Sequence, residues 1–430
     1  MSGDRDRVAS EEWALAEDAA DPLAEFRGEF LIPRHADAEI AYFCGNSLGL
    51  QPRAARTAVT DELDRWAELA VEGHFRGPLP WMDYHEFVRD DLAALVGALP
   101  SEVVAMNSLS VNLHLLMVSF YRPSVERNAI LIEKGAFPSD RYAVEAQLRF
   151  HGFDPATALI ELAADEAEGT LSDDAILRAL DEHANRVALV LLPGVQYLTG
   201  QAFDLRAITE RAHRHGCVVG FDLAHAAGNI DLTLHDSHCD FAVWCSYKYL
   251  NAGPGAVAGA FVHERHAHTL RPRFAGWWGH DKSTRFQMGP HFVPTPGADG
   301  WQLSNPPILA LAPLRISLQL FRRAGRERLH AKSIALTGYL EWLIRHELGD
   351  LLEILTPPSP PRRGCQLSLR VSGPRDAGRS VFDHLQRAGI VVDWREPDVI
   401  RAAPTPLYNR HIDCLRLVGA IADWKRQHTS

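Results

Sequence analysis

Short apolar runs rich in β-branched residues alternate with longer amphipathic stretches through most of this 430-residue chain. Strands and helices that alternate along a chain form a mostly parallel sheet covered by helices. The sequence therefore predicts an α/β architecture. The expected strands span residues 39–45, 103–108, 129–133, 157–162, 187–194, 218–224, 241–246 and 255–262.

Amphipathic segments between these runs predict helices, several of which begin after a Ser or Asp suited to cap them. A long helical pattern at residues 314–348 leads to the proline-rich segment 356–364, and further strands and helices follow it. We predict an N-terminal helical arm at residues 1–40, a large ligand-binding domain at 41–312 and a small C-terminal α/β domain at 313–430.

Charge and cysteine content narrow the class of partner. The formal net charge of −11 argues against nucleic acid, which requires clustered Lys and Arg. No apolar run is long enough for a membrane span, and the acidic N-terminus lacks a signal-peptide core. The six cysteines form no CxxC pair and suit free thiols in a reducing compartment. A cytoplasmic protein with a small-molecule ligand is expected.

Chemically distinctive side chains follow three of the expected strands. Ligands of parallel sheets bind outside the carboxyl ends of the strands. Asp222 and His225 follow one strand, Lys248 follows the next, and Leu109 and Ser110 open a helix directly after a third. Taken singly, each has an ordinary interpretation: a solvated charge, a turn residue or a helix cap.

Together, these groups match the requirements of pyridoxal phosphate. The cofactor needs an amine for a Schiff base, a carboxylate facing its ring nitrogen and a phosphate site. Lys248, Asp222 and the helix end at Ser110 supply these three in turn. Phe137 could stack on the ring, with Asp140 near its edge.

Longer motifs make the chain similar to the kynureninase family, whose enzymes have the pyridoxal phosphate fold type I. The resemblance extends from Tyr42 to Asn409. It rests on the segments "NSLSVNLHLLMVSFYRP", "AFPSDRYAVEAQL", "GFDLAHAAGN", "WCSYKYLNAG", "GWWGH", "STRF" and "LSNPPIL". It implies that the large domain binds pyridoxal 5'-phosphate.

The resemblance also implies roles for individual residues. The implied catalytic residues are Lys248, Tyr247 and Asp222. The implied cofactor contacts are Leu109, Ser110, Phe137, Asp140, Asp222, His225, Tyr247, Lys248, Trp277 and Asn305. The implied substrate contacts are Ser47, His74, Ser304, Asn305 and Arg401. No metal is implied. Trp277 is expected to reach in from a second subunit, so the active enzyme is expected to be a homodimer. From the residues alone, Arg401 has the pattern of a surface charge.

The implied reaction is hydrolysis of the Cβ–Cγ bond of an L-kynurenine, which gives L-alanine and an anthranilate in tryptophan catabolism. Tyr247 either relays a proton through the phosphate or only donates one hydrogen bond to it. His74, Ser304 and Asn305 resemble the set that prefers 3-hydroxykynurenine, and a ring-methylated 3-hydroxykynurenine is the alternative substrate. Pro193 departs from a serine found in some members and removes one donor near the cofactor.

Three other classes of protein share part of this pattern. A cysteine desulfurase shares the layout of Asp and Lys, but it has His before the lysine and needs a mobile catalytic Cys. A metal-dependent hydrolase is suggested by "HERHAH" at residues 263–268, but His263 and His266 lack the zinc-protease spacing and an evident third ligand. These histidines are expected to be solvated. A cofactor-bound regulator would not need Lys248, Asp222 and Arg401 together.

Overall fold

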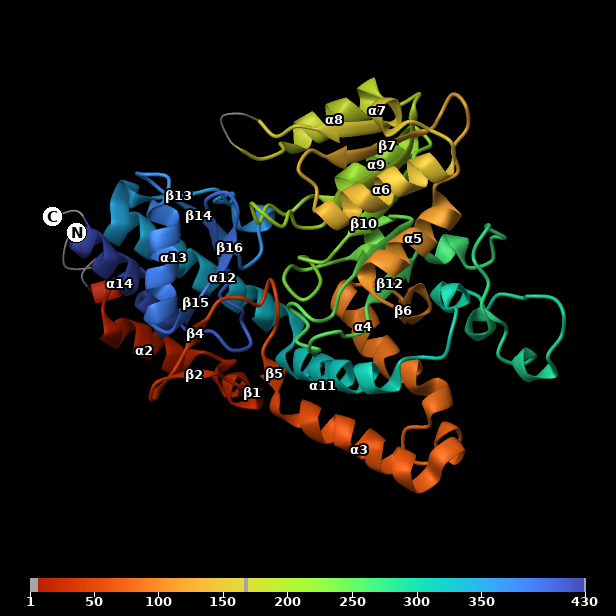
Figure 1. The fold of residues 1–430 in the computed structure, drawn as a ribbon, viewed down its shortest axis with the longest axis horizontal. Helices are drawn as coiled ribbons and strands as arrows, with labels where there is room; N and C mark the ends of the chain where they lie inside the picture. The colour runs from red at the N-terminus through yellow and green to blue at the C-terminus, as the bar shows by residue number, and fades with distance from the viewer. Residues whose placement is uncertain (1–6, 166–168, 429–430) are drawn as a thin grey trace.

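A seven-stranded sheet forms the larger half of the protein (Figure 1). The structure, a computed structural model, describes residues 7–165 and 169–428. The strands of this sheet are β6 (Val103–Ala105), β7 (Ala129–Glu133), β8 (Leu159–Leu162), β9 (Val187–Pro193), β10 (Val218–Asp222), β11 (Phe241–Trp244) and β12 (Gly259–Val262). Seven of the eight expected strands are therefore in this sheet.

The strand order is β6-β12-β11-β10-β9-β7-β8. Strand β12 runs antiparallel to both of its neighbours, and the other neighbouring strands are parallel. The predicted mostly parallel α/β sheet is confirmed. The carboxyl ends of β9, β10 and β11 consequently lie side by side along one edge.

Helices cover both faces of this sheet. Helices α5 (Leu109–Phe120) and α6 (Pro138–Phe150) pack on one face, and α4 (Arg89–Val96), α8 (Asp173–Glu182), α9 (Leu205–Arg214) and α11 (Ile308–Ala324) pack on the other. Neighbouring strand residues such as Ile130 and Leu131 enter opposite cores. Burial on both faces explains the nearly continuous apolar runs in the sequence.

A second, four-stranded sheet lies beside the first in the C-terminal part of the chain (Figure 1). It contains β13 (Leu352–Ile354), β14 (Leu367–Val371), β17 (Val399–Ala402) and β16 (Asp393–Arg395), packed with α12 (Arg326–Leu343), α13 (Ala377–Arg387) and α14 (His411–His428). The long helical pattern at 314–348 is divided into α11 and α12 by Gly325, whose φ of +78° favours glycine.

The first expected strand does not join the large sheet. It forms β4 (Ala41–Tyr42), which pairs with β15 (Ile390–Val391), and Phe43 packs into the C-terminal core. The predicted division of the chain at residues 40 and 312 stays a prediction. Two further strand pairs are short: β1 (Phe30–Leu31) pairs with β5 (Gln51–Pro52), and β2 (Arg34–His35) pairs with β3 (Ala38–Glu39). The long helix α3 (Arg53–Leu69) and the short helices α7 (Pro155–Ala158) and α10 (Leu234–Ser237) are also present.

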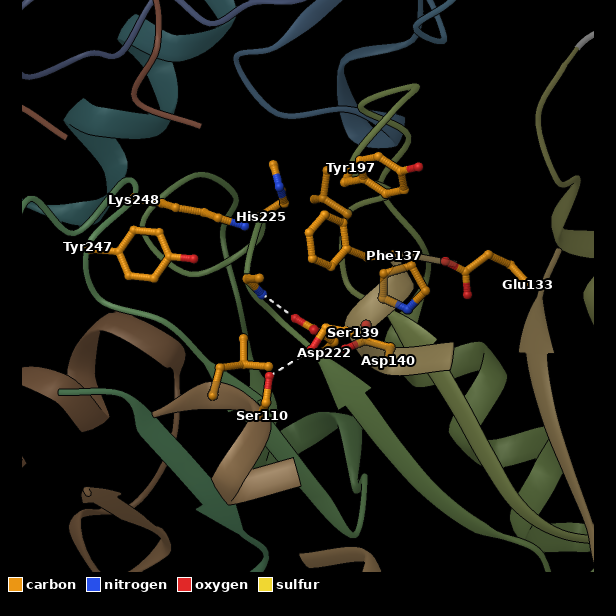
Figure 2. A pocket seen from close by; sticks show the side chains of 14 residues that line it. Ser110, Glu133, Phe137, Ser139, Asp140, Tyr197, Asp222, His225, Tyr247 and Lys248 are labelled. Atoms are coloured by element: carbon orange, nitrogen blue, oxygen red, sulfur yellow. Dashed lines mark hydrogen bonds between the residues drawn. The ribbon is translucent and has the colours of Figure 1, made fainter. Parts of the chain in front are cut away.

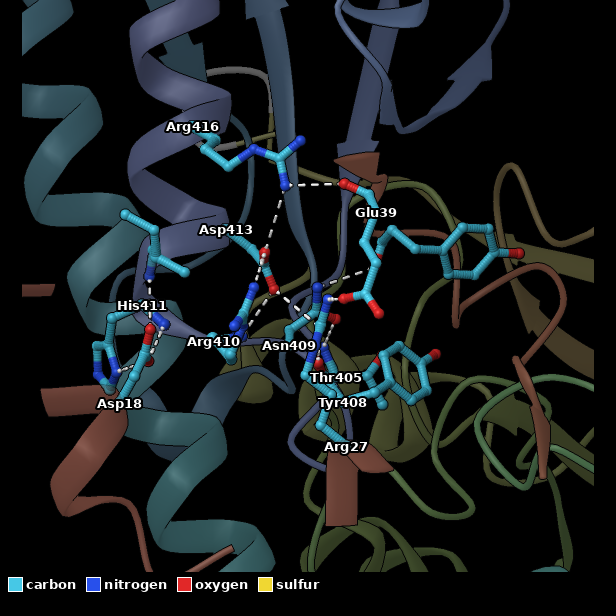
Figure 3. A network of polar contacts seen from close by, with 12 residues as sticks. Asp18, Arg27, Glu39, Thr405, Tyr408, Asn409, Arg410, His411, Asp413 and Arg416 are labelled. Carbon is cyan, nitrogen blue, oxygen red and sulfur yellow. Dashed lines mark hydrogen bonds and ion pairs between the residues drawn. The ribbon is translucent and has the colours of Figure 1, made fainter. Parts of the chain in front are cut away.

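The N-terminal helix α2 (Glu11–Ala20) is joined to the start of α14 by Asp18 (Figure 3). The Asp18 carboxylate accepts the backbone N–H groups of His411 and Ile412 at 2.6 and 3.1 Å. These N–H groups have no partner within a helix, so Asp18 acts as an N-terminal cap supplied from a distant segment. A buried ion pair between Asp21, just after α2, and Lys332 of α12, 2.6 Å long, fixes the C-terminal end of α2.

In the part of the chain that the structure describes, no helix combines the length and apolar character that crossing a bilayer requires.

Replacing Asp18 with Ala is expected to lower the free energy of unfolding by about 1–2 kcal/mol at neutral pH, because α14 loses its cap. Burial alone would raise the pKa of Asp18, but hydrogen bonds from His411 and Ile412 outweigh it and lower the pKa. A lowered pKa means that the ionised carboxylate stabilises the fold above about pH 4 and that this contribution is lost as the pH falls further.

Urea unfolding of the wild type and Asp18→Ala from about pH 7 down to below about pH 4 measures this effect. The difference between the two proteins should shrink at the acidic end. Glu17→Ala, on the exposed side of the same helix, is the control and should match the wild type throughout. Equal midpoints for Asp18→Ala and wild type at neutral pH would contradict the capping role.

Candidate active site

A cavity opens at the carboxyl ends of the parallel strands (Figure 2). Asp222 ends β10, and Lys248 follows β11, the next strand in the sheet. The cavity is lined by Leu109, Ser110, Glu133, Phe137, Ser139, Asp140, Pro193, Val195, Tyr197, Asp222, Ala224, His225, Tyr247 and Lys248. Eight of the residues predicted from the sequence therefore meet in one place.

The loop that carries Lys248 is held by the backbone of Gly49. The Gly49 N–H donates to the carbonyl of Tyr247 at 2.8 Å, and a Cβ at position 49 would lie 2.4 Å from the carbonyl oxygen of Lys248. Only glycine permits this approach. The Lys248 Nζ lies 5.9 Å from the centroid of the Phe137 ring and 6.0 Å from that of Tyr247, so the amine points into the cavity above Asp222 (Figure 2).

Three carboxyl groups converge on the cavity. Burial raises the pKa of Asp140 well above its usual value, and the neighbouring Asp222 raises it further. Burial also raises the pKa of Asp222, but hydrogen bonds from Asp140 and the Ala224 N–H, the latter 2.6 Å long, oppose it. We infer that Asp140 is the neutral donor and Asp222 the ionised acceptor. Burial raises the pKa of Glu133 to about 8, which keeps it mostly protonated at neutral pH.

His225 and Tyr247 keep uncharged side chains beside the amine. Burial and the nearby Lys248 lower the pKa of His225 well below its usual value, so its imidazole is neutral. Its buried Nδ1 has no hydrogen-bond partner among the described residues. Burial raises the pKa of Tyr247, so its hydroxyl remains a donor at neutral pH.

Two helix N-termini face the cavity from below. Helix α5 begins at Leu109, α6 begins at Pro138, and the hydroxyl groups of Ser110 and Ser139 lie 2.7 Å apart (Figure 2). The first N–H groups of a helix are free of intrahelical partners and carry partial positive charge. The pair of helix ends, with two hydroxyl groups, is suited to a phosphate dianion.

The residues present fit pyridoxal phosphate. Lys248 offers the amine, Asp222 a buried ionised carboxylate, His225 and Phe137 ring faces, and the start of α5 an anion site. The unpartnered His225 Nδ1 indicates that the cavity wall is incomplete without a ligand.

Arg401 is fully buried, so the interpretation as a surface charge is wrong. It lies on β17 opposite Asp393 of β16, whose carboxylate accepts its Nε at 3.0 Å. The Arg401 Nη1 donates to the carbonyl of Tyr197 at 2.6 Å, and the Tyr197 ring packs on Phe137 in the cavity wall. The guanidinium is therefore one residue away from the cavity.

Five other predicted residues lie outside the cavity wall of this single chain. Trp277 is 40% exposed and donates its Nε1 to the carbonyl of Arg285. Ser304 and Asn305 are exposed on a segment that packs against the same loop. His74 packs edge-on against Trp81, and Ser47 lies in the turn after Cys44.

The sequence reasoning missed Glu133, Ser139 and Tyr197. Glu133 is the last residue of β7, and Tyr197 follows β9, so the rule that found Asp222 would also have found them. Ser139 adjoins the predicted Phe137 and Asp140. Pro193, the predicted departure, lies directly beside Asp222 on the neighbouring strand.

Solved structures with a similar fold include the cystine C-S lyase C-DES in complex with cysteine persulfide (TM-score 0.75, 20% identity, covering 90% of this chain and 98% of that one). The cysteine desulfurase CsdA from Escherichia coli is similar too (TM-score 0.74, 17% identity, covering 94% and 98%). At these identities the likeness shows the fold alone. The fold is that of the type I pyridoxal phosphate enzymes, as predicted.

The sequence comparisons narrow this class to one family. Proteins named kynureninase from Stenotrophomonas maltophilia (strain K279a) and Xanthomonas euvesicatoria pv. vesicatoria (strain 85-10) are 65% and 64% identical, over 96% of this chain and 97% of each relative. Residues 329–421 match the kynureninase C-terminal domain. The chain belongs to the kynureninase family.

The desulfurase alternative lacks its nucleophile here. All six cysteines of the chain are buried. Burial raises the pKa of Cys245, the cysteine that precedes the Lys248 loop, which disfavours a reactive thiolate.

Proposed function

We propose that this protein hydrolyses the Cβ–Cγ bond of L-kynurenines to L-alanine and an anthranilate, with 3-hydroxykynurenine as its preferred substrate. Pyridoxal phosphate is its cofactor. The observation that carries the proposal is the convergence of Lys248, Asp222 and two helix N-termini on one cavity, in a chain 65% identical to a protein named kynureninase. The six buried thiols support the cytoplasm as its compartment.

When bound, pyridoxal phosphate supplies a conjugated ring that takes up electron density from the Cα of an amino acid. Asp222 would keep a proton on the ring nitrogen, and the neutral Asp140 would keep Asp222 ionised by donating to it. Lys248 would accept the Cα proton, because its amine is the base that points into the cavity.

The substrate would be oriented by groups on both sides of the cavity. Arg401 is proposed to hold the α-carboxylate, because its guanidinium is buried directly behind the cavity wall, where Nε and Nη2 lie 3.0 and 2.8 Å from Asp393 Oδ1. A guanidinium binds a carboxylate through two parallel hydrogen bonds. Tyr247, which stays protonated, would donate to the phosphate or relay a proton through it.

The first test is Lys248→Ala. The absorbance band of lysine-linked cofactor should be lost, and turnover should fall by about 10³-fold or more because the general base is removed. Lys134→Ala, which removes an exposed lysine just beyond β7 at the same edge of the sheet, is the control. A variant at position 248 that kept both the band and the turnover would refute the proposed site.

The proposed ring preference rests on hydrogen bonds to the ring hydroxyl from His74, Ser304 or Asn305. Leaving such groups unpaired costs about 1–3 kcal/mol, so kcat/KM should favour 3-hydroxykynurenine over kynurenine by about tenfold or more. Assaying purified enzyme with both substrates and with a ring-methylated analogue measures this ratio.

Ser304→Ala should reduce the ratio while leaving kcat/KM for unsubstituted kynurenine nearly unchanged, which makes the unsubstituted substrate an internal control. A wild-type preference for unsubstituted kynurenine would overturn the assignment of the ring, although not the reaction. A preference for the methylated ring would assign the enzyme to the alternative substrate.

A homodimer with shared active sites is proposed from the segment that carries Trp277. Its neighbours Leu270, Phe274, Phe286 and Met288 are exposed apolar side chains, and this segment projects from the edge of the protein in Figure 1. Contiguous exposed apolar side chains mark a surface that binds a partner. Trp277, Ser304 and Asn305 would thus reach the cavity of a second copy.

Mixing inactive variants tests this arrangement. If Trp277 acts in the partner's site, dimers of Lys248→Ala with Trp277→Ala chains contain one intact site, and random mixing should restore about a quarter of the wild-type activity. A mixture of Lys248→Ala with Asp222→Ala chains is the control and should stay inactive, because both residues belong to one chain's cavity. If activity is recovered in neither mixture, Trp277 acts in the site of its own chain.

A further inference from the structure

A second polar cluster lies at the edge of the large sheet opposite the cavity. Glu102 precedes β6 and His263 follows the antiparallel β12, so both lie at the edge where the parallel strands begin. His235, on α10 ahead of β11, joins them there. One potential ligand atom from each of the three residues lies within 4.8 Å of the other two.

The expectation that the histidines of "HERHAH" are solvated is wrong for His263 and His266, which are buried, and is confirmed for His268, which is exposed. They point to different carboxylates: the His266 Nε2 lies 2.8 Å from Asp240, and the His263 Nδ1 lies 3.7 Å from Glu102. Only His263 of the motif belongs to the cluster, and its two partners, Glu102 and His235, come from other segments of the chain.

The Glu102 carboxylate is fixed in position by the backbone. Its oxygens accept the N–H groups of Leu99 and Glu264 at 2.9 and 2.8 Å. The His235 Nδ1 lies 3.0 Å from Oε1 of the same carboxylate, and the His235 and His263 rings stack with centroids 5.2 Å apart. The carboxylate is thus oriented before any ligand arrives.

Both imidazoles are suited to bind a metal. Each presents its Nδ1 to the Glu102 carboxylate, with His235 Nδ1 at 3.0 Å and His263 Nδ1 at 3.7 Å from Oε1. The Nε2 of His263 lies 3.3 Å from Nδ1 of His238, a contact that orients the ring and leaves Nδ1 toward Glu102. The backbone N–H of Arg265 donates to the His263 Nδ1 at 3.2 Å, and a bound cation would replace this hydrogen bond.

We propose that Glu102 Oε1, His235 Nδ1 and His263 Nδ1 bind a Zn²⁺ ion, with water in the fourth position. Two imidazoles and one carboxylate form an established zinc ligand set. The side chain of His235 is 30% exposed, which gives the ion a path from solvent. The ion would tie the segment before β6, helix α10 and the end of β12 together at the edge remote from the cavity, so its effect would be on stability.

The test uses the complete enzyme loaded with pyridoxal phosphate, freed of metal by a chelator and then dialysed against Zn²⁺. One tightly held Zn²⁺ per chain is expected, with a rise in Tm of roughly 2–5 °C. His235→Gln keeps a donor for Glu102 but removes the ligand nitrogen, so it should bind Zn²⁺ at least about tenfold more weakly and lose the rise in Tm.

His213→Gln is the matched control. His213 is similarly exposed, at 32% against 30% for His235, and it also lies 3.0 Å from a buried carboxylate, that of Asp240. This variant should bind Zn²⁺ as the wild type does. Equal Zn²⁺ binding by His235→Gln and His213→Gln, or no tight binding by the wild type, would overturn the proposal.

Measuring kcat with and without Zn²⁺ distinguishes failure of the proposed zinc site from failure of the proposed function. Because the cluster is at the opposite edge of the sheet, kcat should be the same with and without Zn²⁺ at temperatures where both forms are folded. A kcat that depended on Zn²⁺ in the wild type and His213→Gln but not in His235→Gln would contradict a purely structural role.

Discussion

The buried carboxylate of Asp222 is the constraint on which the rest of the active site depends. An ionised carboxylate without partners is costly to bury, so the protein surrounds it with a neutral Asp140, the Ala224 N–H and the nearby Lys248 amine. The parallel pairing of β10 with β11 fixes the distance between the acid and the amine. Removing either side chain would leave the other charged group buried without its counterpart. The backbone of Gly49 holds the Lys248 loop in place through its N–H bond to the Tyr247 carbonyl.

Much of the large sheet could be predicted from the sequence because its strands are buried on both faces and its helices have one apolar side. The helices at 173–182 and 205–214 also carry local start signals, since Ser172 and Asp204 cap them as expected. Pairing between distant segments left no local signal. Strand β4 has the composition of a core strand, but its partner β15 lies almost 350 residues away, and only the folded chain shows which sheet it joins.

The active site was predictable where it follows strand ends and not where it depends on tertiary packing. Asp222, Lys248 and Ser110 all come directly after apolar runs, whereas Arg401 lies inside a short strand whose burial is set by Asp393 and Tyr197. The burial of His263 and His266 could not be predicted from the local sequence for the same reason, because each is paired with a carboxylate from another part of the chain. Family resemblance supplied the role proposed for Arg401, and the structure supplies its burial and its hydrogen bonds.

The cap that Asp18 provides for α14 has a consequence for synthesis. The ribosome releases residue 18 long before residue 411, so the first helix must wait for nearly the whole polypeptide before its partner exists. Contacts of such long sequence separation form late and leave apolar surface uncovered meanwhile. Helix α2, β4 and the C-terminal sheet therefore complete their core only after α14 has been synthesised, while the segment from β6 to β12 can fold as it emerges.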